Sequence, residues 1–168
     1  MTYRALGFVV AACAFGIDQI SKGIALATTS LQAGIEVFPF FNFVLVRNYG
    51  VSFGLFAGEA HWGALASIGI AMAIGLSIWM WRSQRKLQVI GIGLLIGGAL
   101  GNVLDRFRHG AVIDFLGFRP VGSGWPAFNL ADVAIVCGAG LLIIESLRSE
   151  SRPQSGLGGP KNSETEEG

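Results

Sequence analysis

The chain has 168 residues, of which 52% are hydrophobic and only 14% are charged. A soluble domain carries about 25% charged residues, so this composition favours an integral membrane protein. The formal net charge is +1 and no basic block stands out to neutralise phosphates, so we expect no nucleic-acid partner.

Four apolar stretches are long enough to cross a bilayer, which takes about 20 mostly apolar residues. The first contains Asp18 and Lys22, and the fourth contains Asp132 and Glu145, so these two have the weaker hydropathy. The second has no charged residue and is bracketed by tryptophans, which suit the two membrane interfaces. The predicted transmembrane helices cover about residues 6–27, 62–81, 87–104 and 129–147.

Longer connecting segments follow the first and the third of these helices. The first segment contains Val37 to Val46, a run rich in aromatic and β-branched residues, and the second contains a similar run from Ala111 to Phe118. We expect both runs to form strands of a small sheet that rests on the membrane surface.

The lysine and arginine residues predict the orientation, because short cytoplasmic loops carry an excess of positive charge. Four crossings put both termini and the connection after the second helix on one side, and this connection contains Arg82, Arg85 and Lys86. We therefore expect both termini in the cytoplasm. Residues 149–168 are rich in Ser, Gly, Pro and Glu, and we expect them to form a disordered tail after a single embedded domain of residues 1–148.

Polar residues from four remote segments fall at the outer ends of the predicted helices. A helix rises about 1.5 Å per residue, so this placement follows from the direction in which each helix runs. An ionisable residue at a helix centre costs roughly 2.5–3.5 kcal/mol on insertion, so such residues are usually functional. The polar residues are Asp18, Lys22, Asn102, Asp105, Arg106, Asp114, Asn129 and Asp132.

Two pairs among these residues also have a purely structural interpretation. Asp18 and Lys22 stand four residues apart on one helical face, where they can pair with each other. Asn129 and Asp132 have the spacing of an N-cap residue and an acid in the first turn of the fourth helix.

Similar alternatives hold for the end of the third helix. Asp105 and Arg106 can be interfacial residues whose side chains reach to water. Gly97 and Gly101 form a GxxxG pair, which favours close helix packing over catalysis.

The candidate chemistry is that of two acids, since no serine or cysteine nucleophile is paired with a base. We expect Cys13 and Cys137, which lie in apolar runs, to be buried packing residues. Asp114 and Asp132 flank a loop that returns the chain to the membrane. Two carboxylates that meet cannot both ionise, so the pKa of one rises and the pair shares a proton. One acid can then take a proton from water while the other donates to a carbonyl oxygen, which hydrolyses an amide without a covalent intermediate.

Five short motifs occur in order along the chain. They are Asp18-Gln19-Ile20-Ser21-Lys22, Arg47-Asn48-Tyr49-Gly50-Val51-Ser52-Phe53-Gly54, Gly97-Gly98-Ala99-Leu100-Gly101-Asn102-Val103-Leu104-Asp105-Arg106, Val112-Ile113-Asp114-Phe115 and Phe128-Asn129-Leu130-Ala131-Asp132. Together they resemble the lipoprotein signal peptidase (signal peptidase II) family of aspartyl intramembrane proteases, from Asp18 to about Ile135. Each motif alone is weak, but five in order on a chain with four spans are specific.

The resemblance implies a fold and an activity. The fold is an α-helical integral membrane protein with four transmembrane helices, a small extracytoplasmic β-cradle and a short surface helix, here at about Phe56 to His61. The activity is removal of the signal peptide from a prolipoprotein, by cleavage just before a cysteine that carries a diacylglyceryl group, with no metal or organic cofactor. We therefore expect a monomer in the bacterial inner (cytoplasmic) membrane, in contact with phospholipid, with its active site facing the periplasm.

The resemblance also implies roles for individual residues. Asp114 and Asp132 would be the catalytic dyad, and Asp18, Lys22 and Asp105 would support the site through polar contacts. The residues that would line the substrate cleft are Asn48, Gly50, Asn102, Arg106 and Asn129.

Two other functions remain open on the sequence alone. A proton-coupled carrier would place ionisable residues along a path or near the midplane, whereas here the inner halves of the helices carry almost none apart from Glu145. A non-catalytic membrane scaffold would use the outer acids only to order loops. Both predict that Asp114→Asn or Asp132→Asn leaves the processing of lipidated precursors unchanged.

Overall fold

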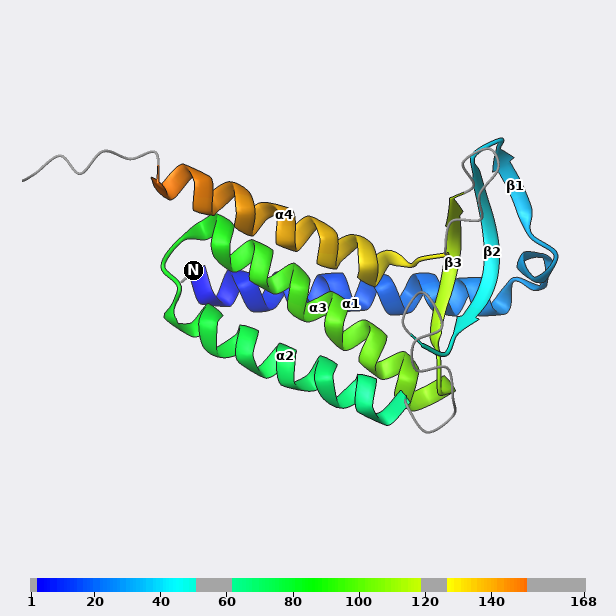
Figure 1. Ribbon diagram of the computed structural model, residues 1–168, viewed down its shortest axis with the longest axis horizontal. Coiled ribbons are helices and arrows are strands. Elements are labelled where there is room, and N and C mark those ends of the chain that lie inside the picture. The colour runs from blue at the N-terminus through cyan, green and yellow to red at the C-terminus, as the bar shows by residue number, and fades with distance from the viewer. Residues whose placement is uncertain (1–2, 51–61, 119–126, 151–168) are drawn as a thin grey trace, which may run out of the picture.

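Four long helices lie side by side, and a small sheet covers one end of them (Figure 1). The computed structural model describes residues 3–50, 62–118 and 127–150. The N-terminus, the connection between the second and third helices and the end of the fourth helix all lie at the end opposite the sheet (Figure 1). The helices are α1 (Tyr3–Ala27), α2 (Trp62–Arg82), α3 (Lys86–His109) and α4 (Leu130–Glu150).

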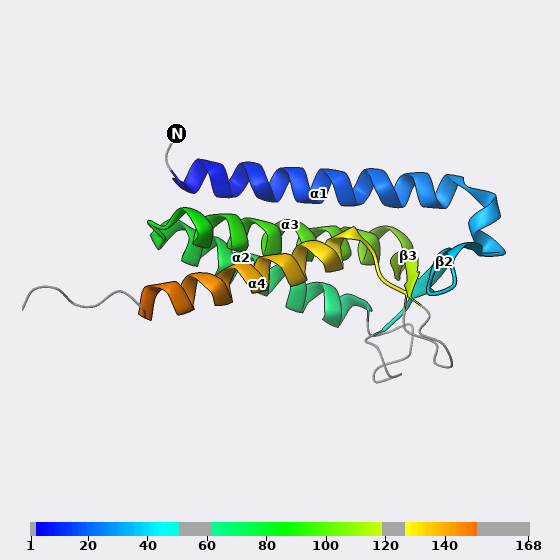
Figure 2. The ribbon, with the colours of Figure 1, turned by 90° about the horizontal axis from the view of Figure 1, so that it is seen from above.

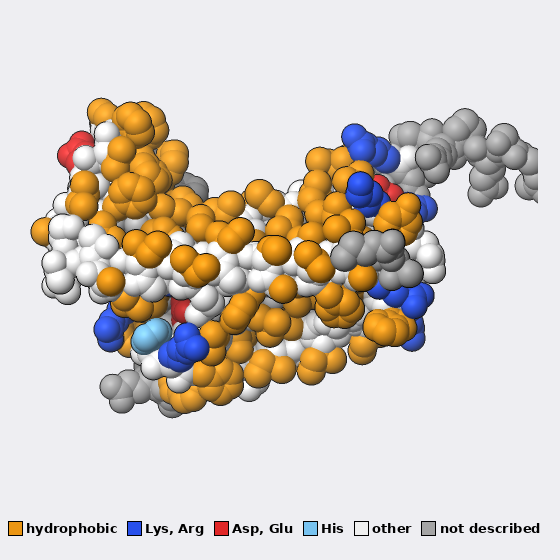
Figure 3. Space-filling model, turned by 180° about the vertical axis from the view of Figure 1, so that it is seen from behind, with side chains coloured by type: hydrophobic (Ala, Val, Ile, Leu, Met, Phe, Trp, Pro, Cys, Tyr) orange, Lys and Arg blue, Asp and Glu red, His pale blue; other side chains and the backbone are white. Residues whose placement is uncertain are grey.

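The lateral surface of the bundle is apolar. Large side chains such as Ile20, Ile74 and Val136 are 66%, 57% and 70% exposed, whereas lysine and arginine side chains gather near the two ends (Figure 3). All four helices are long and apolar enough to cross a membrane, which confirms the four predicted spans. The expectation that Cys13 and Cys137 are buried is wrong, since both are exposed. An apolar run predicts burial only in a soluble core, because in a membrane protein an outward apolar face meets lipid.

Helix α3 is the centre of the bundle, because the other three helices pack against it (Figure 2). Its glycines make this approach possible. A Cβ added at Gly97 would overlap the backbone carbonyl of Ala11, and one added at Gly101 would overlap the carboxylate of Asp18. The interpretation of Gly97 and Gly101 as packing residues is confirmed.

Each of the four helices extends past at least one of its predicted ends, and α3 differs most. Helix α3 was expected to end at Leu104 but continues to His109, so Asp105 lies inside the helix. The helix continues because the Asp105 carboxylate finds buried partners instead of water, as described below. It ends where Gly110 adopts a left-handed φ of 66° and donates its N–H to the carbonyl of Arg106 at 3.0 Å.

Helix α4 also runs past its predicted end. It continues through Glu150, two residues into the predicted tail, and residues 151–168 lie outside the described part of the chain. The surface helix expected at about Phe56 to His61 lies outside the described residues as well.

The sheet has three antiparallel strands in the order β1-β2-β3. They are β1 (Ile35–Phe38), β2 (Phe41–Asn48) and β3 (Val112–Phe118). The single strand predicted from Val37 to Val46 is in fact a hairpin, which turns at Pro39 and Phe40. Proline has no N–H to donate to a strand ladder, so the run divides there. The strand predicted from Ala111 to Phe118 is confirmed apart from its first residue.

The sheet rests on the end of α1 and brings β2 beside β3. Ala25, Leu31 and Phe115 form an apolar cluster beneath it, with Leu31 in a short 3₁₀ helix, η1 (Thr29–Gln32). The register opposes Val46 to Asp114 and Asn48 to Val112. The end of β2 is thereby placed next to an aspartate of β3.

Candidate active site

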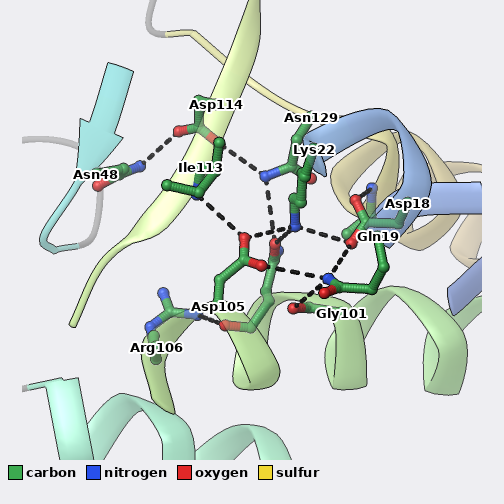
Figure 4. A network of polar contacts seen from close by, with 12 residues as sticks. Asp18, Gln19, Lys22, Asn48, Gly101, Asp105, Arg106, Ile113, Asp114 and Asn129 are labelled. Atoms are coloured by element: carbon green, nitrogen blue, oxygen red, sulfur yellow. Dashed lines mark hydrogen bonds and ion pairs between the residues drawn. The ribbon is translucent and has the colours of Figure 1, made fainter. Parts of the chain in front are cut away.

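Asp114 on β3 and Asp132 on α4 both form hydrogen bonds with Asn129. The side-chain Nδ2 of Asn129 donates to Asp114 Oδ1 at 2.6 Å (Figure 4). Its backbone N–H donates to Asp132 Oδ2 at 3.2 Å, and its Oδ1 accepts the backbone N–H of Asp132 at 3.0 Å. Asn129 is fully buried, so one residue without access to solvent connects the two carboxylates.

The bonds between Asn129 and Asp132 also form a capping box at the start of α4. Asn129 precedes the first helical residue, Leu130, and each residue accepts the backbone N–H of the other. The structural interpretation of this pair is therefore confirmed. It leaves Asp132 Oδ1 free of the cap, and this oxygen accepts a hydrogen bond from Asn102 Nδ2 at 2.9 Å.

Asn102, near the end of α3, extends the network toward α1. Its Oδ1 accepts hydrogen bonds from Asn129 Nδ2 at 3.2 Å and from Lys22 Nζ at 3.0 Å. Because its Nδ2 holds Asp132, the two ends of one amide connect α4 with the lysine of α1. The carbonyl of Asn102 also accepts a hydrogen bond from Arg106 Nη1 at 3.1 Å.

Asp114 accepts amide donors on both carboxylate oxygens. Besides Asn129 on Oδ1, Asn48 Nδ2 donates to its Oδ2 at 3.1 Å. The backbone N–H of Gly50 donates to Asn48 Oδ1 at 3.2 Å, which turns the Nδ2 of Asn48 toward the aspartate. The pKa of Asp114 is raised to about 6. Burial is the main cause and the neighbouring charge of Asp132 adds to it, whereas the two amide donors and Lys22 act in the opposite direction.

Asp18, Lys22 and Asp105 form a buried ion cluster behind the two aspartates. Lys22 Nζ lies 2.8 Å from Asp18 Oδ2 and 2.8 Å from Asp105 Oδ2, and each of the three side chains is at most 3% exposed (Figure 4). The expected pairing of Asp18 with Lys22 is confirmed. The interpretation of Asp105 as an interfacial residue that reaches to water is wrong, because the lysine and two further donors hold its carboxylate inside the protein.

Sequence reasoning assigned no role to Gln19, although the residue lies in the first motif. Its Nε2 lies 3.1 Å from Asp18 Oδ2, 3.2 Å from Asp105 Oδ1 and 3.3 Å from the carbonyl of Gly101. Its position beside Asp18 within a polar interruption of an apolar helix is the signal that points to it.

One continuous network connects every candidate site residue. Hydrogen bonds and ion pairs lead from Gly50 through Asn48 to Asp114, then through Asn129 and Asn102 to the ion cluster, with Arg106 on the Asn102 carbonyl. Among the residues that the structure describes, no group of three or more His, Cys, Asp or Glu side chains is placed to hold a metal ion. The arrangement offers two linked carboxylates at the junction of the bundle and the sheet.

Comparison with known proteins identifies the family. The model of the Peptidase_A8 family, described as signal peptidase (SPase) II, matches residues 10–148. The chain belongs to the signal peptidase II family. It is thus an enzyme of an aspartic peptidase family, with four apolar helices and a small antiparallel sheet.

Individual relatives agree over most of their length. The lipoprotein signal peptidase of Alteromonas mediterranea is 40% identical over 93% of this chain and 91% of its own. That of Nitrobacter hamburgensis is 44% identical over 87% of this chain and 94% of its own. Two bacterial membrane enzymes solved by the in meso method, at 2.3 Å and 1.9 Å resolution, give TM-scores of 0.79 and 0.75. They are 29% and 31% identical, and cover 92% and 86% of this signal peptidase and 95% and 94% of their own chains.

Proposed function

We propose that this signal peptidase II removes the signal peptide from diacylglyceryl-modified prolipoproteins by cleaving just before the lipidated cysteine, with Asp114 and Asp132 as its catalytic pair. The observation that carries the assignment is the buried Asn129, which is bonded to both carboxylates although they belong to different elements. The relatives named above are lipoprotein signal peptidases, which supports the substrate class.

The two acids have different surroundings, which suggests different roles. Asp114 is 2% exposed and burial raises its pKa to about 6, so it holds a proton below that pH and is the group that we assign as the acid. Asp132 accepts N–H donors on both oxygens in the first turn of α4, and we assign it as the base. Asp132 would take a proton from water as the oxygen attacks the scissile carbonyl, while Asp114 gives its proton to the carbonyl oxygen. Asp132 would then give the proton that it took from water to the amide nitrogen as the C–N bond breaks, while Asp114 takes back a proton from the gem-diol hydroxyl. The signal peptide leaves with a carboxyl end, and the lipidated cysteine keeps a free amine.

The position of the site suits a lipidated substrate. The candidate dyad lies at the end of the bundle that the sheet covers. The opposite end holds the N-terminus, the end of α4 and the connection between α2 and α3, which contains Arg82, Arg85 and Lys86. In our proposal the termini are cytoplasmic and the sheet faces the periplasm, in the inner membrane. The acyl chains of the substrate would stay in the outer leaflet, among phospholipids, and the bond beside the modified cysteine would reach the carboxylates near the headgroups, where water is available.

The remaining candidate residues would contact or orient the substrate from around the dyad. Asn48 and Arg106 are half-buried, so each has surface left for a peptide or lipid carbonyl, whereas the buried Asn129 is committed to its partners in the protein. Asn102 and Gly50 are the other two residues that we propose for the substrate cleft. No second subunit is needed to complete this network, and we propose that the enzyme acts as a monomer.

Replacement of each aspartate tests the assignment. Asp114→Asn and Asp132→Asn are each expected to lower kcat for a diacylglyceryl-modified prolipoprotein by about 10²–10⁴-fold, the range of general acid–base catalysis, while the protein still inserts and folds. The matched control is Glu145→Gln, which changes an acid at the opposite end of the bundle. Normal cleavage by both aspartate variants would remove Asp114 and Asp132 as the catalytic pair.

An unmodified precursor tests the substrate class separately. The same prolipoprotein without its diacylglyceryl group is expected to be cleaved poorly, because the acyl chains would hold the scissile bond at the depth of the carboxylates. Equal kcat/KM for the two precursors would contradict the proposed lipid dependence without affecting the assignment of the aspartates.

A further inference from the structure

A single lysine holds two carboxylates that come from different helices. Lys22 Nζ lies 2.8 Å from Asp18 Oδ2 on its own helix, α1, and 2.8 Å from Asp105 Oδ2 on α3. Its third neighbour is Asn102 Oδ1 at 3.0 Å. An ammonium group has three N–H donors, so these three acceptors use all of them.

Each carboxylate of this cluster also holds a backbone amide, and the positions of the two amides are the basis of the inference. Asp105 Oδ2 accepts the N–H of Ile113 at 3.1 Å, and Asp18 Oδ1 accepts the N–H of Ala131 at 2.9 Å. Ile113 immediately precedes Asp114, and Ala131 immediately precedes Asp132. The bond to Ala131 also satisfies one of the four helix N–H groups that have no partner within α4.

We propose that Asp18, Lys22 and Asp105 form a buried clamp that sets the distance between Asp114 and Asp132, with Lys22 as the positioning residue that ties its two arms together. This inference rests on the proposed function, since it matters for catalysis only if these aspartates are the catalytic pair. The arms act through the backbone. Each bond holds the peptide group one residue before the peptide that joins the aspartate to the chain. Fixing this group limits where the Cα of the aspartate lies, and so the place from which its side chain reaches the substrate.

The positive charge is what allows the two arms to approach each other. Asp18 and Asp105 both come within 2.8 Å of the same nitrogen, so without Lys22 two nearly unexposed carboxylates would face each other and repel. Gln19 Nε2 also touches both carboxylates, but it is neutral and cannot replace the charge. A shift of about 1 Å between catalytic groups costs roughly 100-fold in rate, so a loosened clamp would be visible in kcat.

A merely stabilising cluster and a clamp predict different results for paired substitutions. Asp105→Asn keeps an oxygen that can accept the Ile113 N–H, whereas Asp105→Ala removes it. Asp18→Asn and Asp18→Ala make the same comparison for Ala131. If the cluster only stabilises the bundle, kcat measured well below the unfolding temperature will not distinguish alanine from asparagine at either position.

The experiment measures kcat, KM and Tm for the full-length enzyme in detergent, with a diacylglyceryl-modified prolipoprotein peptide as substrate. If the cluster acts as a clamp, kcat of each alanine variant falls by about 100-fold while KM stays nearly unchanged. The kcat of each asparagine variant stays at least about tenfold above that of the alanine variant at the same position. Equal kcat values within both pairs would overturn the proposal. Should one alanine variant fail to fold, the pair at the other position makes the same test.

Lys22→Met supplies a second measurement that stability alone would not change. Removal of the ammonium takes away a charge that lowers the pKa of Asp114, so the alkaline limb of the pH–kcat profile moves to higher pH as kcat falls. An unchanged limb together with an unchanged kcat would also overturn the clamp. The outcomes separate the two proposals, because normal cleavage by Asp114→Asn ends the proposed function, whereas normal kcat in both alanine variants beside an inactive Asp114→Asn ends only the clamp.

Discussion

The side-chain amide of Asn129 lies 2.6 Å from Asp114 Oδ1, and this is the shortest hydrogen bond to either of the two linked aspartates. It joins a strand to the first turn of a helix through a residue that the helix already uses as its N-cap. Capping and bridging are thus combined in one side chain, and a suitable pair of substitutions separates them.

Asn129→Ser and Asn129→Ala are expected to lose activity alike but to differ in stability. A serine can still cap α4 but is too short to reach Asp114, whereas alanine does neither. Both should lower kcat by roughly 100-fold, because the carboxylates lose the group that connects them. Only the alanine variant should lose about 1 kcal/mol of stability for the missing cap. Activity assays and thermal unfolding in detergent check this, and full activity of the serine variant would contradict a bridging role.

The rate of cleavage should fall as pH rises through about 6. Burial raises the pKa of Asp114 to about 6, so its acid form predominates below that pH and is lost above it, by about tenfold per pH unit. Asn48→Ala removes a hydrogen bond that favours the charged carboxylate and lowers this pKa, so the limb should move to higher pH. The facing charges of Asp132 and Lys22 remain in this variant. A rate that instead increases through pH 6 would assign Asp114 as the base.

Gly101→Ala should disturb the candidate site by displacing Asp18. The added Cβ would overlap the Asp18 carboxylate, which holds Lys22 and the start of α4. We expect a loss of about 1–3 kcal/mol in stability, typical of overpacking, together with reduced activity. Gly75→Ala is the matched control, since that glycine of α2 has no atom within 4 Å of the added Cβ. Comparable Tm and activity in the two variants would contradict the tight fit of Asp18 against α3.

Cysteine labelling tests the proposed orientation. In a background without Cys13 and Cys137, Glu36→Cys on β1 should react with a membrane-impermeant maleimide in intact spheroplasts. Arg85→Cys, at the opposite end, should react only after permeabilisation. Both positions are exposed, so accessibility of the side chain does not limit either reaction. The opposite pattern would reverse the predicted topology.

Hydropathy and the order of residues along the chain were sufficient to predict much of the fold and the depth of the candidate site. Four spans, the two strand-forming regions and a common depth for Asp18, Asp105, Asp114 and Asp132 all follow from local composition and helix rise, and the ordered motifs pointed to the family. Local rules failed where neighbouring structure decided the outcome. Asp105 continues α3 because its partners are buried, and the first strand region turns back on itself at Pro39.

What only the tertiary structure decided is which polar groups meet. The contacts from Lys22 to Asn102, from Gln19 to Asp105 and from Asp18 to the amide of Ala131 join residues 80, 86 and 113 positions apart. Such contacts depend on how closely α1 and α4 approach the glycine face of α3 and on how each helix is rotated about its axis. Hydropathy fixes the depth of a residue along a helix, but side-chain packing between helices fixes its direction, and the meeting of the two aspartates at Asn129 depends on both.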